Sequence, residues 1–435
     1  MTTFSDERAT SGKLSLAEIL ETFAGGGELP LKFSAYDGSS AGPDDAELGL
    51  DLLTPRGTTY LATAPGDLGL ARAYVSGDLD VHGVHPGDPY ELLKALDQSM
   101  DFKRPPARVL VDIVRSIGIE RLKPIAPPPQ EALPRWRRIA EGLRHSKKRD
   151  AEAIHHHYDV SNAFYEWVLG PSMTYTCAYY PNAAATLEEA QENKYRLVFE
   201  KLNLKAGDRL LDVGCGWGGM VRYAARRGVK VIGVTLSREQ AAWAQKAIAD
   251  QGLADLAEVR HSDYRDVRES GFDAVSSIGL TEHIGVANYP SYFGFLKSKL
   301  RTGGLLLNHC ITRPDNKPTS TGGFIDRYVF PDGELTGSGR IITAVQNVGL
   351  EVTHEENLRH HYALTLRDWC RNLVDNWDEA VAEVGLATAK VWGLYMAGSR
   401  LGFETNVVQL HQVLAVKLDG KGGDGGLPLR QWWTA

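Results

Sequence analysis

The sequence predicts an α/β fold in which a mostly parallel sheet is covered by helices on both faces, preceded by a smaller α+β domain. Two observations lead to this prediction. From about residue 205, short apolar or β-branched runs alternate with helical stretches, which is typical of parallel sheets. A proline-rich joint at 124–134 separates these runs from the residues before them. The 435 residues are enough for two domains with buried cores.

The N-terminal part is expected to mix short helices and strands. Residues 14–23 have helical spacing that ends at a run of three glycines. Strand-like pieces follow at 29–33 and 58–63, and helices are expected at 68–75 and 90–95. The predicted divisions are an N-terminal α+β domain at 1–123, a linker with a basic segment at 124–150, a larger domain at 151–417 and a flexible tail at 418–435.

The larger domain alternates regularly between the two kinds of element. The expected strands are 209–213, 229–234, 257–261, 272–278 and 304–308. The expected helices include 219–227, 238–249 and 289–300. The C-terminal stretch 366–417 is also expected to be helical, and the residues after it are rich in glycine.

The composition excludes several classes of protein. A net charge of −7 argues against general nucleic-acid binding. There is no apolar run of membrane-spanning length and no signal-peptide pattern. The four cysteines are scattered without a C-x-x-C pair, which indicates a reducing cytoplasm rather than a zinc or disulfide framework. The triplet 155–157 is all histidine, but consecutive side chains point in different directions, so no metal site is expected.

A basic segment follows the proline-rich joint directly. Residues 135–149 hold seven Lys or Arg and one Glu. One interpretation is a solvated helix face or linker. The other is a dock for anionic phospholipid headgroups, where each basic residue contributes about 1 kcal/mol. Trp136 suits a membrane interface.

The densest motif is a glycine-rich turn, Leu210-Leu-Asp-Val-Gly-Cys-Gly-Trp-Gly-Gly219. A buried strand is expected to end at Asp212, glycines then allow a tight turn and close ligand approach, and a helix begins behind them. The glycine spacing also fits the dinucleotide-binding fingerprint, so a nicotinamide enzyme is the natural rival.

Two features favour a methyl donor over a nicotinamide. Dinucleotide sites place an acid at the tip of the second strand, whereas this tip reads Gly233-Val-Thr-Leu-Ser237. Class I methyltransferases instead keep an acid just before the glycines, where Asp212 stands. Asp263, Tyr264 and Arg265 follow the next strand, where adenine is usually held. The expected donor contacts are Asp212, Gly214, Cys215, Gly216, Trp217, Thr235, Leu236, Gln240, Asp263, Tyr264 and Arg265.

Several ordered motifs together resemble the cyclopropane-fatty-acyl-phospholipid synthase family, whose relatives include the mycolic acid cyclopropane synthases. The motifs are His156-His-Tyr-Asp-Val-Ser-Asn162, Met173-Thr-Tyr-Thr-Cys-Ala178, the glycine turn, Gly233-Val-Thr-Leu-Ser237, Asp263-Tyr-Arg-Asp266 and Glu282-His-Ile-Gly285. The resemblance runs from about residue 155 to 417 and continues more weakly into 68–77.

The resemblance implies a class I, Rossmann-like methyltransferase domain that uses S-adenosylmethionine. It implies cis-unsaturated acyl chains of phospholipids as substrate and a bound bicarbonate ion as base. Tyr175 and Thr176 match a pair beside the donor, although the family more often has Ser at the second position. The positions that match the ion-binding residues are Cys177, Glu282, His309, the backbone of Ile311, and Tyr362. The long N-terminal domain is most similar to actinobacterial members that make methylene- or methyl-branched stearates, such as the tuberculostearic acid precursor.

The chemistry explains these residue types. An isolated alkene is a weak nucleophile, so proximity to the donor in a dry channel must drive its attack. The resulting carbocation needs an aromatic, water-free wall, for which Tyr175, Tyr179, Tyr180, Trp217 and Tyr264 are candidates. Loss of a proton from the new methyl closes a cyclopropane, whereas loss from a neighbouring carbon leaves an alkene or, after rearrangement, a methylene branch.

The expected partner is an anionic phospholipid surface, met from the cytoplasm at the inner face of the membrane. The family implies a homodimer, no nucleic-acid partner is expected, and a separate reductase could complete a methyl branch. Two alternatives stay open: an N- or O-methyltransferase of a soluble small molecule, and a non-catalytic lipid-binding protein of the same fold.

Overall fold

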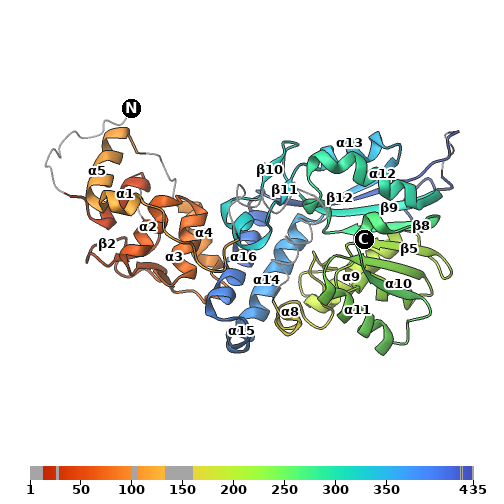
Figure 1. The fold of residues 1–435 in the computed structure, drawn as a ribbon, viewed down its shortest axis with the longest axis horizontal. Coiled ribbons are helices and arrows are strands. Elements are labelled where there is room, and N and C mark those ends of the chain that lie inside the picture. Colours follow the sequence, from red (N-terminus) through yellow and green to blue (C-terminus); the bar gives the residue numbers. More distant parts are fainter. Residues whose placement is uncertain are drawn as a thin grey trace. The chain divides into compact units, whose positions relative to one another are not determined.

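A computed structural model describes residues 13–25, 29–99, 105–132, 160–421, 423 and 425–433. The chain divides into two compact units, Met1–Pro129 and Gln130–Ala435 (Figure 1). The division falls within the proline-rich joint. The basic segment 135–149 and the histidine triplet lie outside the described residues.

The N-terminal unit is built on a four-stranded sheet of order β2-β1-β3-β4. Its strands are β1 (Lys32–Ala35), β2 (Ser40–Ala41), β3 (Gly49–Leu52) and β4 (Leu79–His82). β1 runs parallel to β3, and the other two pairings are antiparallel. Its helices are α1 (Leu16–Phe23), α2 (Pro55–Thr63), α3 (Asp67–Val75), α4 (Tyr90–Ser99), α5 (Ala107–Ile117) and the short η1 (Ile119–Leu122).

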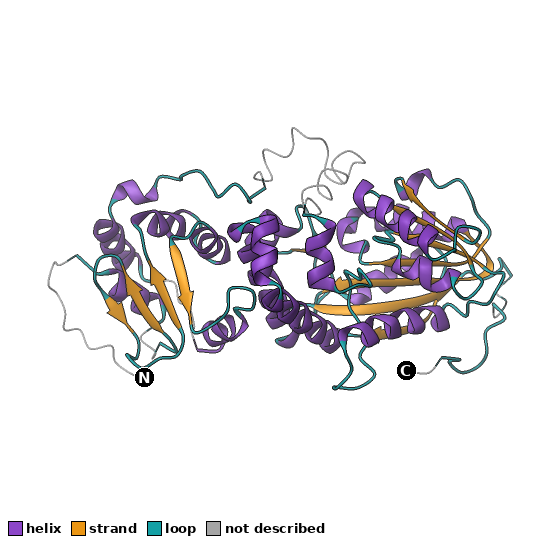
Figure 2. Ribbon diagram, turned by 90° about the horizontal axis from the view of Figure 1, so that it is seen from below, coloured by secondary structure: helices purple, strands orange, loops and turns teal. Residues whose placement is uncertain are grey.

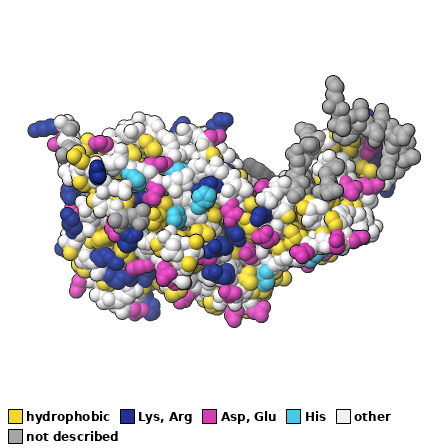
Figure 3. Space-filling view, turned by 180° about the vertical axis from the view of Figure 1, so that it is seen from behind, with side chains coloured by type: hydrophobic (Ala, Val, Ile, Leu, Met, Phe, Trp, Pro, Cys, Tyr) yellow, Lys and Arg dark blue, Asp and Glu magenta, His cyan; other side chains and the backbone are white. Residues whose placement is uncertain are grey.

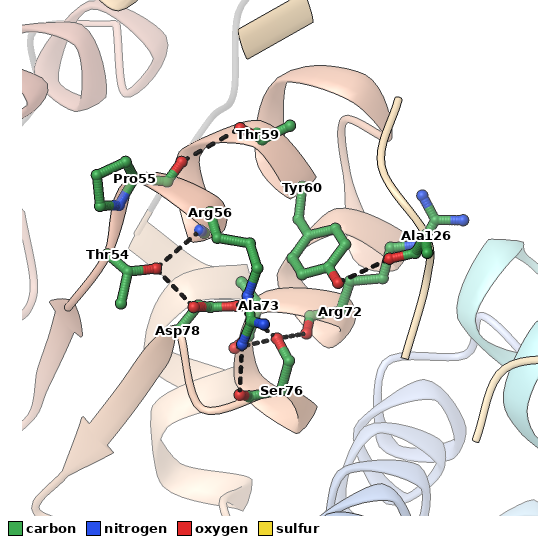
Figure 4. Close-up of polar contacts among 11 residues, drawn as sticks. Thr54, Pro55, Arg56, Thr59, Tyr60, Arg72, Ala73, Ser76, Asp78 and Ala126 are labelled. Atoms are coloured by element: carbon green, nitrogen blue, oxygen red, sulfur yellow. Dashed lines mark hydrogen bonds and ion pairs between the residues drawn. The ribbon is translucent and has the colours of Figure 1, made fainter. Parts of the chain in front are cut away.

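The prediction of a strand at 58–63 is wrong, because these residues belong to α2. Thr54 caps the helix by accepting a hydrogen bond from Gly57 N, and Pro55 occupies the first helical position. The Thr54 hydroxyl also donates to the buried carboxylate of Asp78 at 2.5 Å, and Arg56 Nε donates to it at 2.7 Å (Figure 4). These start signals outweigh the β-propensity of the threonines that follow.

The larger unit contains a seven-stranded sheet of order β12-β13-β9-β8-β5-β6-β7. Its strands are β5 (Arg209–Val213), β6 (Lys230–Thr235), β7 (Ala257–His261), β8 (Phe272–Ile278), β9 (Leu300–Thr312), β12 (Glu351–Asn357) and β13 (Gln409–Val416). The pairings from β7 to β9 are parallel, whereas β13 runs antiparallel to both β9 and β12. The strand order reverses between β5 and β8, which is where ligands bind in open α/β sheets.

Helices cover both faces of this sheet, as predicted (Figures 1 and 2). On one side lie α9 (Leu187–Lys201), α10 (Gly219–Ala225) and α11 (Arg238–Asp250), and on the other lie α12 (Tyr289–Lys299) and α13 (Ser338–Asn347). The apolar residues of β5 between them are fully buried. The remaining short elements are α8 (Asn162–Leu169), η3 (Tyr264–Asp266), η4 (Thr281–His283), η5 (Val286–Asn288), β10 (Thr319–Ser320), η6 (Ile325–Val329) and β11 (Glu334–Leu335).

The C-terminal part is helical only in its first two thirds. α14 (Arg359–Asp375), α15 (Trp377–Val384) and α16 (Leu386–Glu404) agree with the expectation, but β13 is a strand. Almost every residue of β13 is buried, so its sequence lacks the alternation that distinguishes a strand from a buried helix. The tail beyond it, expected to be flexible, has contacts of its own: Trp432 Nε1 donates to Glu200 O at 2.7 Å, and Trp433 is buried.

Within the described residues, no helix is both long enough and apolar enough to cross a bilayer. The same residues contain no group of three or more His, Cys, Asp or Glu side chains that could hold a metal ion. On the face drawn in Figure 3, basic and acidic side chains lie interspersed, in agreement with the modest net charge of −7.

Candidate active site

A cavity of about 140 Å³ lies at the carboxyl edge of the parallel strands, where the strand order reverses. The segments that follow β5, β6, β7 and β8 all contribute to its wall. Of the residues expected to contact the donor, all but Asp263 line it: Tyr175, Thr176, Asp212, Gly214, Cys215, Gly216, Trp217, Thr235, Leu236, Gln240, Tyr264 and Arg265.

The glycine turn has the backbone shape that the sequence predicts. Gly214, Gly216 and Gly218 have φ angles of 76°, 54° and 72°, in the left-handed region that favours glycine. Gly218 also caps α10. A Cβ on Gly216 would meet no heavy atom within 4 Å, so conformation rather than crowding requires glycine there. The turn therefore presents bare backbone to the cavity.

The tips of the next two strands complete one end of the cavity. Thr235 Oγ1 donates to Gln240 Oε1 at 2.8 Å, and both residues are buried. Leu236 follows on the wall, so this tip presents no acid of the kind that a dinucleotide site places there. Asp263 lies behind the wall, where its carboxylate accepts hydrogen bonds from the backbone and guanidinium of Arg265 at 2.6–2.8 Å. It orients Arg265 instead of lining the cavity.

Lys194 of α9 is a wall residue that sequence reasoning missed. It is 1% exposed, and its Nζ donates to Thr176 Oγ1 at 3.1 Å and lies 3.7 Å from the centre of the Tyr195 ring. Burial lowers the pKa of Lys194 to about 7, against the opposing effect of Asp212. Burial likewise raises the pKa of Asp212 to about 6, and Ser276 Oγ donates to its carboxylate at 2.6 Å. Nothing in the helical pattern of α9 distinguishes this lysine from a surface one.

Aromatic rings gather on one side of the cavity. The Tyr175 ring lies 5.8 Å from Tyr165, 5.4 Å from Trp369 and 5.8 Å from Trp392, and its hydroxyl donates to Tyr395 at 3.1 Å. These four partners come from α8, α14 and α16, so only the fold reveals them. Trp217 also joins this group, since its ring lies 4.7 Å from that of Tyr165.

Two of the predicted wall residues have structural surroundings instead. Tyr179 stacks on His361 with ring centres 4.5 Å apart, and the Tyr180 hydroxyl donates to Asp368 at 2.8 Å. Both rings pack against α14 and neither lines the cavity.

The five residues expected to bind an ion do not line the cavity, but hydrogen bonds and strand pairing bring their backbone segments together. Glu282 Oε1 accepts a hydrogen bond from Ile311 N at 2.7 Å. Ile311 lies two residues after His309 on β9. The Tyr362 amide donates to Leu358 O, and the Cys177 thiol lies 3.1 Å from Ala178 O and 3.9 Å from Leu358 O. The Leu358 amide in turn donates to Leu410 O, and Leu410 lies opposite Ile311 in the sheet.

This cluster adjoins the cavity through neighbours along the chain. Thr176 precedes Cys177, and His283 follows Glu282, and both Thr176 and His283 line the cavity. Residues that are far apart in the sequence thus meet where β9, β13, the start of α14 and the segment at 173–178 come together.

Among the described residues, two polar atoms of this cluster are buried without a hydrogen-bond partner, Glu282 Oε2 and His309 Nε2. Buried polar atoms in native proteins almost always have partners, so such a pair indicates a site for a small polar ligand. Burial raises the pKa of Glu282 to about 7, although the bond from Ile311 N opposes it. Burial, together with Lys194 and Lys201, lowers the pKa of His309 well below its usual value, so the imidazole is neutral.

Cys177 is fully buried, and burial raises the pKa of its thiol well above the usual range. A thiol in this state is a poor nucleophile, because the thiolate is the reactive form. Tyr362 is also buried, with its ring 4.6 Å from Phe403. Cys177 therefore has the surroundings of a hydrogen-bonding group rather than of a covalent catalyst.

Known proteins resemble the chain over long stretches. A family model described as mycolic acid cyclopropane synthetase matches residues 145–413. A probable fatty acid methyltransferase of Mycobacterium tuberculosis is 78% identical over 98% of this chain and 99% of its own length. A probable fatty acid methyltransferase of Pseudomonas putida is 47% identical over 64% of this chain and 72% of its own length.

Solved structures match the same architecture. A cyclopropane synthase from Mycobacterium tuberculosis superposes with a TM-score of 0.58 and 31% identity, over 61% of this chain and 98% of that one. A mycolic acid cyclopropane synthase crystallised with SAH and CTAB gives a TM-score of 0.57 and 30% identity over the same shares. These matches confirm the predicted Rossmann-like α/β fold. Since the family model covers more than half of its residues, the chain belongs to the mycolic acid cyclopropane synthetase family.

Proposed function

We propose that this protein is an S-adenosylmethionine-dependent fatty acid methyltransferase that acts on the cis double bond of an unsaturated acyl chain in a phospholipid. The relatives named above support S-adenosylmethionine-dependent methylation of fatty acids, because two are called probable fatty acid methyltransferases and one solved structure holds SAH. A relative from Gibberella zeae, 32% identical over 64% of this chain, is called a sphingolipid C9-methyltransferase. The observation that supports a double bond as the acceptor is that Glu282 and His309 have buried, unpartnered polar atoms in the cluster next to a cavity with an aromatic side.

The residues of the cavity fit the methyl donor. The glycine turn would lie along its amino-acid part, Thr235 and Gln240 suit its ribose hydroxyls, and Tyr264 and Arg265 suit its adenine. Lys194 and Asp212 supply one buried basic and one buried acidic group, which complements a donor with both charges. When bound, the donor supplies an electrophilic methyl group on a sulfonium.

The aromatic side of the cavity suits an alkene acceptor. Methyl addition to a double bond leaves a carbocation, which aromatic faces stabilise and which water would quench. Tyr175 stands between the cavity and the rings of Trp369 and Trp392, so it can contribute one such face. An N- or O-methyltransferase has no need of this surrounding, because its acceptor carries a lone pair.

The buried pair Glu282 and His309 fits a small oxyanion. A neutral imidazole and a carboxyl whose pKa is about 7 can both donate hydrogen bonds to such an ion. Bicarbonate, when bound, would supply a base for the proton that the carbocation loses. The part that the protein's own residues play is to hold the ion, and we propose that Cys177 and Tyr362 assist.

We further propose that the enzyme works as a peripheral protein on an anionic phospholipid surface at the inner face of the cytoplasmic membrane, as a homodimer. The seven basic residues of the segment at 135–149 support the electrostatic part of this proposal. The product depends on which proton is lost, giving a cyclopropane or a methylene branch that a separate reductase would convert to a methyl branch.

The test uses vesicles of phosphatidylglycerol that carry either oleoyl or stearoyl chains. The full-length protein and methyl-labelled S-adenosylmethionine are added, and the lipids are hydrolysed for mass spectrometry. We expect a gain of one carbon only in the oleoyl chains, because stearoyl chains lack the double bond. Label that stays in the aqueous phase, or equal label in both lipids, would overturn the proposal.

A further inference from the structure

A buried chain of hydrogen bonds leads from the surface of β12 to His309. β13 runs antiparallel to β9 and sets Gln412 directly opposite His309. The Nε2 of Gln412 lies 3.1 Å from His309 Nδ1, and Lys201 Nζ donates to Gln412 Oε1 at 2.8 Å. Lys201 ends α9, is fully buried, and forms an ion pair with Glu356 of β12.

The hydrogen bonds from Lys201 through Gln412 to His309 fix which atom donates and which accepts at each step. A lysine ammonium only donates hydrogen bonds, so the amide atom that faces Lys201 must be the oxygen. The amide nitrogen of Gln412 therefore faces His309 and donates to it. Nδ1 must then accept, and a neutral imidazole with an accepting Nδ1 carries its proton on Nε2.

The Nε2 atom is the nitrogen that has no partner in the part of the chain that the structure describes. The next residue along β13 provides a contrast. His411 Nδ1 lies 2.7 Å from Thr312 Oγ1, and its Nε2 lies 3.1 Å from Glu355 Oε1, so both of its nitrogens are satisfied within the protein. His309 is held at one nitrogen in the same manner but leaves the other free.

We propose that Gln412, oriented by Lys201, is a positioning residue that fixes His309 as an Nε2–H donor toward the bound oxyanion. This inference rests on the proposed function, because it assigns a tautomer to a residue of the ion site. Neither Lys201 nor Gln412 lines the cavity, so their effect is expected to pass through the imidazole. The burial of a whole lysine costs stability, which is consistent with a role beyond packing.

The first test determines the tautomer of His309 directly. Nitrogen-15 NMR of protein labelled at histidine separates protonated from unprotonated ring nitrogens, and a His309→Gln sample assigns the signals. We expect a protonated Nε2 and an unprotonated Nδ1 in the wild type. In Gln412→Glu, a carboxylate faces Nδ1 beside Lys201, so the proton should move to Nδ1. A wild-type His309 with its proton on Nδ1 would overturn the inference.

Activity on oleoyl vesicles is the second measurement. Gln412→Glu should lower kcat about 100-fold or more, because an imidazole in the wrong tautomer cannot donate to the ion, while KM for the donor stays within about twofold. The matched control is Gln409→Glu, the same change on the same strand, where the side chain of Gln409 donates to Asn406 Oδ1 at 2.7 Å near the surface. Lys201→Arg keeps a donor to the amide and should keep the Nε2–H tautomer.

The outcomes separate this inference from the proposed function. An unchanged tautomer in Gln412→Glu, or an equal loss of kcat in Gln409→Glu, would refute the positioning role. If the tautomers are as expected but even the wild type leaves oleoyl chains unchanged, the hydrogen-bonded chain is upheld and the proposed substrate is wrong.

Discussion

The strongest quantitative prediction concerns Glu282→Gln and the dependence of stability on pH. Burial raises the pKa of Glu282 from 4.5 to about 7. Between these values the folded state binds the proton more tightly than the unfolded chain does. The carboxyl therefore contributes its full stabilisation below pH 4.5 and loses it as the pH rises through 7. A difference of about 2.5 pKa units corresponds to about 3 kcal/mol.

The assay is denaturant unfolding of the wild type and of Glu282→Gln at pH 5 and pH 8, in buffers purged of bicarbonate. The glutamine does not titrate, so the difference between the two proteins isolates the carboxyl. We expect the stability of the wild type relative to the variant to fall by about 2–3 kcal/mol from pH 5 to pH 8. Glu334→Gln is the matched control, because Glu334 also accepts a backbone hydrogen bond, from Val286 N at 2.8 Å.

A difference between wild type and Glu282→Gln that stays within about 0.5 kcal/mol at both pH values would refute the reasoning. In that case the carboxyl would reach water or an unrecognised cation, and the site would not be the desolvated pocket that the ion proposal needs. A difference of the opposite sign, with the wild type gaining stability as the pH rises, would mean that the carboxylate is paired in the folded state.

Four further predictions follow from the site. Glu282→Gln should lower turnover of oleoyl vesicles at least about 100-fold while SAH affinity by calorimetry stays within about twofold; full turnover would remove the ion site. Asp212→Asn should weaken SAH binding about 10- to 100-fold, and unchanged binding would limit Asp212 to capping the turn. Lys194→Met should lower the midpoint of thermal unfolding, because it leaves the buried carboxyl of Asp212 without its neighbouring cation, and should weaken SAH binding; a raised midpoint would contradict this. Trp433→Ala should cost about 3 kcal/mol in denaturant unfolding, whereas a change below about 0.5 kcal/mol would return the tail to a flexible segment.

The donor cavity could be predicted from the sequence because most of its residues are contiguous. The turn after Asp212 and the tips of β6 and β7 each bring neighbouring residues to one edge of the sheet. Parallel strands make this possible, since every strand end meets the same edge. Lys194 escaped prediction because a buried lysine on a helix carries no local signal; only the packing of α9 against the sheet brings it to the wall.

The residues behind His309 could not be predicted for a different reason. β12 was missed because Val352 is its one apolar residue, and β13 was missed because it is buried on both faces. Without β13 there is no partner opposite His309, and Gln412 has no assigned position. The aromatic residues of α8, α14 and α16 likewise converge only through tertiary contacts, since each helix alone shows an ordinary apolar face.

The same physical criterion separates structural from functional polar residues in the buried interior of this enzyme. Asp368 is 1% exposed, yet Tyr180, Arg367 and Arg371 all lie within 3.3 Å of its carboxylate, so its charge is fully compensated. Glu282 is also buried, at 8% exposure, but one of its oxygens accepts from a backbone amide and the other has no partner among the described residues. Unpartnered buried atoms occur elsewhere among the described residues, for example His354 Nε2, but Glu282 bonds to Ile311 N, two residues from the unpartnered His309 on β9. The position of Glu282 beside a histidine with one free nitrogen is the reason to assign the chemistry to this cluster and the binding of the donor to the cavity next to it.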